Sequence, residues 1–161
     1  EAAIDYVQRM AREKAQVVSA RYQEETSVVL AADTSVVVDD VILGKPEDYA
    51  EALKMLTLLS GSRHTVMTAV CLQAFGSVQC KLVATDVDFA DLSQVQCEAY
   101  LATSEPWDKA GAYAIQGIAA AFVTGIQGSY SNVVGLPLFE TWQMLKSVGV
   151  RGALTVPTAA H

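Results

Sequence analysis

The segment Val28-Val29-Leu30-Ala31-Ala32-Asp33-Thr34 joins an apolar run to a carboxylate, and the turn Gly44-Lys45-Pro46 follows it along the chain. The apolar run predicts a buried strand, and open α/β sheets bind their ligands at the carboxyl ends of such strands. We therefore expect Asp33 to lie at a strand end that faces a ligand. A lysine close behind the acid favours a phosphorylated ligand, because a divalent metal and a cation together commonly hold and polarise phosphate.

Outward from this stretch, the hydrophobic periodicity predicts helices that alternate with strands. Helices are expected over 4–22, 48–59, 93–102 and 137–148, and strands over 27–32, 35–43, 64–75, 78–90 and 118–126. Turns are expected at Asp39-Asp40 and Gly76-Ser77, which would close two hairpins. The pattern predicts an α/β or mixed α+β domain over residues 1–150, built on a mixed sheet, and a loose tail over 151–161.

Composition limits the possible classes of protein. A chain of 161 residues, 52% of them hydrophobic, is sufficient for one globular domain. Its apolar runs are too short for a membrane span, and its first residues lack the pattern of a signal peptide. The formal charge of −7 argues against a nucleic-acid partner but not against a nucleotide, which needs only a local cluster of cations. We therefore expect a cytoplasmic protein with neither a membrane nor a nucleic acid as partner.

Three cysteines, Cys71, Cys80 and Cys97, are scattered along the chain without the spacing of a metal site. Their number is odd, and disulfides are rare in the cytosol. We expect all three to be reduced structural thiols.

Three charged residues are candidates for a phosphate site, each with an ordinary alternative. Asp33 is a metal ligand or a base that orients water, or else it caps a turn. Lys45 contacts phosphate, or it is a solvated surface residue. Lys14 lies in the middle of the apolar stripe of the first helix, so its amine either reaches out to solvent or points into a cavity.

The Gly-rich second half contributes further candidates. Lys109 contacts phosphate or pairs with its neighbour Asp108 at the surface. Gln116 reads the edge of a base or ribose, or it satisfies a buried backbone group. His64, at the start of a strand, is expected to be structural rather than catalytic.

An ordered set of short motifs resembles the Maf (septum formation inhibitor) family. The motifs are Ala11-Arg12-Glu13-Lys14-Ala15, Ala32-Asp33-Thr34, Leu43-Gly44-Lys45-Pro46, Leu59-Ser60-Gly61 with His64 and Thr68, Glu105-Pro106 with Asp108-Lys109-Ala110-Gly111, Tyr113-Ala114-Ile115-Gln116-Gly117, and Gly128-Ser129-Tyr130 with Val133-Val134-Gly135-Leu136-Pro137-Leu138. Each is weak alone, but together they extend from about Glu1 to Val148 in the order that the family has.

The resemblance implies a hydrolase that converts nucleoside triphosphates to monophosphate and pyrophosphate with Mg²⁺ or Mn²⁺. It implies an elongated mixed sheet flanked by helices around a central cleft, similar to inosine triphosphatases, and often a homodimer. By the same resemblance, Asp33 takes the metal and catalytic role and Lys45 is catalytic and contacts phosphate. Lys14, Lys109 and Gln116 are then substrate-binding residues.

Within the family, Lys109 and Gln116 resemble the dTTP/UTP branch rather than the branch that acts on 7-methyl-GTP. The alternative from another class is a nucleotide-binding regulator of septation that has no turnover. Family members also begin with a strand and an arginine-containing loop that this sequence does not show. From that difference we expect a missing amino-terminal segment and weakened activity of the chain as given.

Overall fold

A single elongated sheet forms the centre of the molecule. The structure is a computed structural model, and it describes residues 1–22 and 26–154. The sheet has five strands in the order β2-β1-β3-β4-β5. The strands are β1 (Val29–Val38), β2 (Val41–Leu43), β3 (Arg63–Ala74), β4 (Ser77–Phe89) and β5 (Val123–Gln127). The α+β class is confirmed, but every strand pairing among the described residues is antiparallel, so the predicted mixed pairing is not found there.

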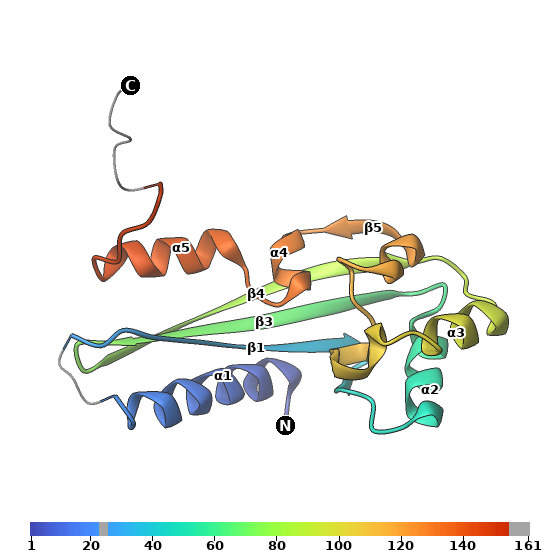
Figure 1. The fold of residues 1–161 in the computed structure, drawn as a ribbon, viewed down its shortest axis with the longest axis horizontal. Coiled ribbons are helices and arrows are strands. Elements are labelled where there is room, and N and C mark those ends of the chain that lie inside the picture. Colours follow the sequence, from blue (N-terminus) through green and yellow to red (C-terminus); the bar gives the residue numbers. More distant parts are fainter. Residues whose placement is uncertain (23–25, 155–161) are drawn as a thin grey trace.

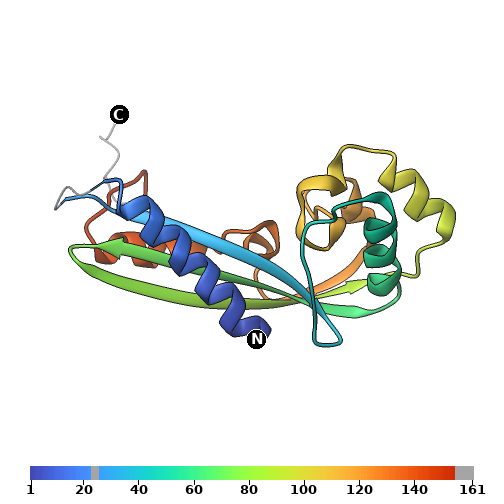
Figure 2. The ribbon, with the colours of Figure 1, turned by 90° about the horizontal axis from the view of Figure 1, so that it is seen from below.

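Helices cover both faces of this sheet and one of its ends (Figure 1, Figure 2). The α-helices are α1 (Ala3–Ser19), α2 (Tyr49–Leu59), α3 (Gln94–Leu101), α4 (Tyr130–Val134) and α5 (Leu138–Ser147). Three 3-10 helices are η1 (Glu105–Asp108), η2 (Ala110–Ala112) and η3 (Ile118–Phe122). Figure 1 shows α1 on one side of the sheet, α4 and α5 on the other, and α2 and α3 at the end of the long strands.

The alternation of side chains along β1 explains the two-sided covering. Val29 and Ala31 pack with the α1 side, whereas Val28, Leu30 and Ala32 pack with the α5 side. Successive residues of a strand point to opposite faces, so a continuous apolar run can serve two helices. A third and larger cluster lies at the α2 and α3 end.

Helix α1 buries a narrower stripe than its sequence predicts. Val7, Ala11 and Ala15, spaced four residues apart, are fully buried against the sheet. Val17 and Val18, which the about 100° per residue of an ideal helix would place on the same apolar stripe, are exposed at 57% and 39%. The helix therefore packs closely through two alanines.

Asp33 does not lie at a strand end, so that prediction is wrong. Strand β1 continues without a break through Asp33, which is paired with Ala69 of β3, and the chain turns only at Asp39-Asp40. The expected strand over 118–126 is also shorter, because residues Ile118–Phe122 form η3 and β5 begins at Val123. The polar residues Asp33 and Thr34 suggest that the strand ends there, but their pairing with Ala69 and Thr68 of β3 keeps it continuous.

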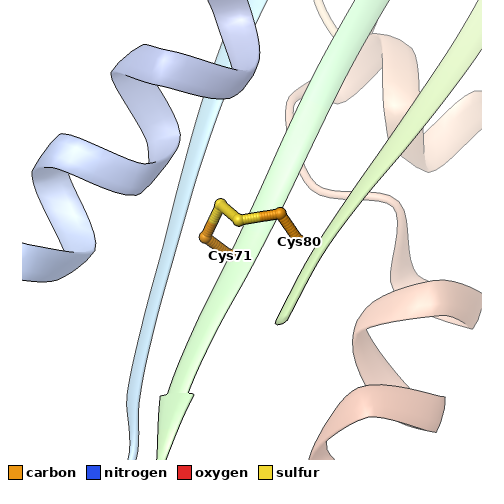
Figure 3. The surroundings of a disulfide bond; sticks show 2 residues. All are labelled: Cys71 and Cys80. Carbon is orange, nitrogen blue, oxygen red and sulfur yellow. A yellow bond between two sulfur atoms is a disulfide. The ribbon is translucent and has the colours of Figure 1, made fainter. Parts of the chain in front are cut away.

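Cys71 and Cys80 form a disulfide, which corrects the expectation of three reduced thiols (Figure 3). The β3–β4 hairpin pairs these two residues directly opposite each other. Their Cα atoms lie 4.1 Å apart, so the disulfide bridges the two strands at a close approach. Cys97 is a free, buried cysteine, and burial raises the pKa of its thiol.

The expected tail is described only in part. Residues 151–154 follow α5 as a turn, whereas 155–161 lie outside the described residues. None of the helices in the described ranges combines the length and apolar character needed to cross a bilayer.

Candidate active site

All five side chains that the sequence nominates line one cavity. It has a volume of about 210 Å³ and is bounded by α1, β1, α4 and the loops around Lys45 and 108–116. Lys14, Asp33, Lys45, Lys109 and Gln116 all contribute to its wall. Residues separated by as many as 102 positions therefore share one site.

The first wall of the cavity is formed by α1 and β1, which an ion pair between Lys14 and Asp33 joins. The Lys14 Nζ donates a hydrogen bond to Asp33 Oδ1 at 2.6 Å, and the side chains are 51% and 14% exposed. Of the two alternatives for Lys14, the amine points to a carboxylate in a cavity rather than only to solvent. Asp33 is likewise a strand residue with a charged partner and not a turn cap.

The cavity follows an open strand edge. Strand β2 pairs only with Val36–Val38, so among the described residues the earlier part of β1 is paired on its β3 side alone. Thr34 points to the face opposite Asp33, where its Oγ1 lies 2.9 Å from the Thr68 Oγ1 and 3.5 Å from the Gly135 carbonyl. Ligand groups can therefore approach side chains on both faces of one strand.

Two loops bring the remaining lysines to this edge. The Gly111 N–H donates to the Gly44 carbonyl at 3.0 Å, which joins the turn before Lys45 to the turn after Lys109. Gly111 has φ +71° and approaches Val36 so closely that a Cβ would crowd it. A backbone hydrogen bond therefore joins the two lysine turns.

Lys109 also has the partner that its sequence alternative predicts. Its Nζ lies 2.7 Å from Asp108 Oδ1, and both residues line the cavity. The bond from Lys109 lowers the pKa of the Asp108 carboxyl. Lys109 therefore both pairs with Asp108 and lines the cavity.

The second wall is built on a buried aromatic cluster. Tyr113 lines the cavity, and its hydroxyl lies 2.7 Å from His64 Nε2. His64 is 2% exposed, stands edge-on to Phe89, and does not line the cavity. Burial lowers the pKa of His64 to about 4, partly offset by Asp88 and Asp86, so the ring is neutral at pH 7. This arrangement agrees with a structural role.

Gln116 lies at the tip of this wall. Its side chain is exposed at the cavity and makes no hydrogen bond to another residue of the described ranges, so it is free to meet a ligand. Sequence reasoning missed Tyr113 and Thr34 as wall residues. Both stand within the quoted motifs: Thr34 follows Asp33, and Tyr113 is three residues before Gln116. Because side chains alternate along a strand, Thr34 is expected on the face of β1 opposite Asp33.

The charges of the cavity suit a phosphorylated ligand. Three lysines and two carboxylates, Asp33 and Asp108, line it. Within the described ranges, no cluster of three or more His, Cys, Asp or Glu side chains could hold a metal on its own. Mg²⁺, however, is usually held by one or two carboxylates together with substrate phosphates and water, and two carboxylates, Asp33 and Asp108, line this cavity.

The comparisons with known proteins agree with this geometry. A family model described as Maf-like protein matches residues 1–148. A dTTP/UTP pyrophosphatase of Acinetobacter baylyi is 50% identical over 143 residues, which cover 89% of this chain and 77% of that protein. Proteins of the same name from Nitrosomonas europaea (50% identical, 93% and 74% covered) and Alcanivorax borkumensis (51%, 91% and 75%) are similar over the same extent. The chain therefore belongs to the Maf family.

Proposed function

We propose that this chain hydrolyses dTTP and UTP to the nucleoside monophosphate and pyrophosphate. The observation that carries the proposal is the convergence of Lys14, Asp33, Lys45, Lys109 and Gln116 on one cavity. Relatives about 50% identical over most of the chain are named for this activity. A catalyst, rather than a septation regulator without turnover, is the function that these findings favour.

The reaction is attack of water on the α-phosphorus with pyrophosphate as the leaving group. The protein contributes mainly positioning and charge neutralisation to such a displacement. We assign Lys14, Lys45 and Lys109 to the phosphate oxygens and Gln116 to the base or sugar. Lys45 also stabilises the charge that develops on the leaving pyrophosphate.

Asp33 is the proposed base that orients and deprotonates the attacking water. Its carboxylate is paired with Lys14 at 2.6 Å. A bound triphosphate offers Lys14 a second, stronger negative partner, and this exchange frees Asp33 to accept the proton of water. The ion pair is thus a resting arrangement of two groups that separate during the reaction.

A divalent cation fits the donor set described above. Asp33, with Asp108 nearby, would hold Mg²⁺ or Mn²⁺ together with the phosphate oxygens of the substrate. The ion supplies neutralisation of phosphate charge when it is bound. The preference for dTTP and UTP is assigned to Gln116, the residue of the loop wall that is proposed to meet the base or sugar.

Product analysis tests the proposal directly. The chain is mixed with Mg²⁺ or Mn²⁺ and dTTP, UTP, CTP or 7-methyl-GTP, and the products are separated by anion-exchange chromatography. We expect equimolar monophosphate and pyrophosphate from dTTP and UTP. Binding of these nucleotides without pyrophosphate release would contradict the proposal and support the regulator.

One substitution isolates the base. Asp33→Asn keeps the size of the side chain and should lower kcat by about 10²- to 10⁴-fold, the usual contribution of general base catalysis. Asp40→Asn is the matched control, because Asp40 lies in the β1–β2 turn at φ 63°, a conformation that Asn accepts. Near-normal turnover by Asp33→Asn, with an unchanged melting temperature, would remove Asp33 from the mechanism.

We also propose a cytoplasmic location and a homodimer. The cytoplasm holds the nucleotide substrates, and its reducing conditions would convert the Cys71–Cys80 disulfide to thiols. Light scattering after size-exclusion chromatography measures the oligomeric state, and a monomer at micromolar concentration would contradict the dimer.

A further inference from the structure

Glu105 lies outside the cavity lining, yet it is bonded to the loop that forms its second wall. The carboxylate, on η1, accepts three hydrogen bonds. Oε1 accepts from the Ile118 N–H at 2.7 Å, and Oε2 accepts from the Ala119 N–H at 3.1 Å and from the Tyr100 hydroxyl at 2.6 Å. Two of the three donors belong to the backbone just after Gln116.

Tyr100 fastens the other side of the same loop. Its hydroxyl, on a side chain only 3% exposed, accepts the Ala114 N–H at 3.3 Å while donating to Glu105. The Tyr100–Glu105 pair therefore contacts the backbone both before and after Gln116. Bonds at both ends leave the three residues between them little freedom to move.

Gly117 makes the close approach of Glu105 possible. A Cβ at this position would overlap the Glu105 carboxylate itself. The backbone next to Gln116 thus lies directly against the carboxylate, an arrangement that any other residue would obstruct.

The carboxylate acts here as a hydrogen-bond acceptor and not as an acid. Burial raises the pKa of Glu105, but the bonds from Tyr100, Ile118 and Ala119 outweigh burial and hold the pKa below its usual value. The group is therefore ionised at neutral pH, and all three donors face a charged acceptor.

We propose that Glu105, supported by Tyr100, is a positioning residue that fixes the 114–119 loop so that Gln116 meets the nucleotide. This inference rests on the proposed function, since it assigns the loop's purpose to nucleotide turnover. Glu105 touches neither the cavity nor a substrate in it, so its effect is transmitted through Gln116.

A double-mutant cycle with dTTP tests this inference. Glu105→Gln replaces one carboxylate oxygen with an NH₂ group, which cannot accept a hydrogen bond, so at least one of the three donors loses its acceptor and the attachment is weakened. Misplacement of a substrate contact by about 1 Å can reduce the rate up to 10²-fold, so we expect kcat/KM to fall about 10- to 100-fold. In the Gln116→Ala background the same change should add less than about twofold, because the group that it positions is already absent.

Controls separate positioning from a loss of folding. Glu98→Gln lies on the exposed side of α3, where, in the part of the chain that the structure describes, the Glu98 carboxylate accepts a hydrogen bond from Gln94 and none from the 114–119 loop. It removes a carboxylate without touching the loop and should leave kcat/KM unchanged. Tyr100→Phe keeps the ring and loses the hydroxyl, so it should change kcat and KM in the same sense as Glu105→Gln. If the double variant lowers kcat/KM by the product of the two single-variant factors, Glu105 does not act through Gln116 and the inference is overturned.

A second readout does not depend on turnover. Amide hydrogen exchange at Ile118 and Ala119 should be slow in the wild-type chain and at least tenfold faster in Glu105→Gln. Equal exchange in both would overturn the attachment. A wild-type chain without dTTP turnover would instead count against the proposed function, and the exchange result would still decide whether Glu105 holds the loop.

Discussion

The two walls of the cavity are held in different ways. The helix wall, Lys14 on α1 and Asp33 on β1, is joined by an ion pair whose lysine is 51% exposed. The loop wall, which carries Lys109, Tyr113 and Gln116, is held by buried hydrogen bonds between Tyr113 and His64 and from the Ala114 N–H to the Tyr100 hydroxyl. Exposed ion pairs contribute about 0–1 kcal/mol to stability, whereas leaving a buried polar group unpaired costs about 1–3 kcal/mol.

The difference indicates that the helix wall is able to rearrange when the ligand binds, whereas the loop wall is preformed. An ion pair that contributes little can be exchanged for a phosphate contact when a triphosphate enters, so the helix wall is suited to respond to the ligand. Buried hydrogen bonds resist such exchange, so the loop wall presents Gln116 in a preformed position. Perturbing the loop wall should therefore change stability more than perturbing the helix wall.

The largest expected effect on stability is the titration of His64 behind the loop wall. Its pKa is lowered from 6.5 to about 4 in the folded chain, so the unfolded chain binds more protons between these values. Stability contributed by the neutral ring is complete above pH 6.5 and is lost as the pH falls towards 4. The full shift corresponds to about 3 kcal/mol of the free energy of unfolding.

Urea denaturation at a series of pH values measures this effect. His64→Gln removes the titrating group and keeps a polar atom for Tyr113, so the variant should lose stability less steeply between pH 6.5 and 4. Parallel pH profiles for the two chains would show that His64 does not carry the dependence.

The next largest expected effect on stability is the reduction of the Cys71–Cys80 disulfide, in the part of the sheet that α1 covers. Cys71 belongs to the cluster that receives Val7, Ala11 and Ala15, and it is bonded to Cys80. A disulfide that closes a loop of about ten residues stabilises a fold by about 2–3 kcal/mol in the chain-entropy description. Reduction should lower the free energy of unfolding by that amount.

Denaturation with and without dithiothreitol measures this contribution, and Cys71→Ser with Cys80→Ser reproduces the reduced state. Cys97→Ser is the control, because this thiol is free. We expect turnover to change less than twofold, since neither cysteine lines the cavity. A large loss of activity on reduction would mean that the helix wall depends on the disulfide.

Much of the fold was predictable from local signals. Helices α1 and α2 and the turns at Asp39-Asp40 and Gly76 occur where the sequence indicates them. The order of pairing was not predictable, because it depends on contacts between distant segments. For that reason the sequence places Asp33 at a strand end. Cys71 and Cys80 are only nine residues apart across a predicted hairpin, so the error there is of another kind: the odd number of cysteines and the expected cytosolic location favour thiols over a disulfide.

The site was predictable in its residues but not in its construction. The apolar stripe of the first helix singles out Lys14 as a cation, and the short motifs single out Lys45, Lys109 and Gln116. No local signal indicates that Tyr100 and Glu105 hold the loop of Gln116, since those bonds exist only after η1 and η3 come together. Supporting contacts of this kind become visible only in three dimensions.

The smallest expected effect on stability is the removal of Lys14 from the helix wall. Lys14→Met keeps much of the side chain's length and deletes the charge, so the free energy of unfolding should change by less than about 1 kcal/mol. If Lys14 leaves Asp33 to bind phosphate, the same variant should raise KM for dTTP about 10- to 100-fold, the equivalent of one charge-assisted hydrogen bond. Steady-state kinetics at low and high salt measures this, with Lys54→Met on the exposed side of α2 as the matched loss of a lysine. An unchanged KM would mean that Lys14 serves only to neutralise Asp33, and both walls would then be fixed before the substrate binds.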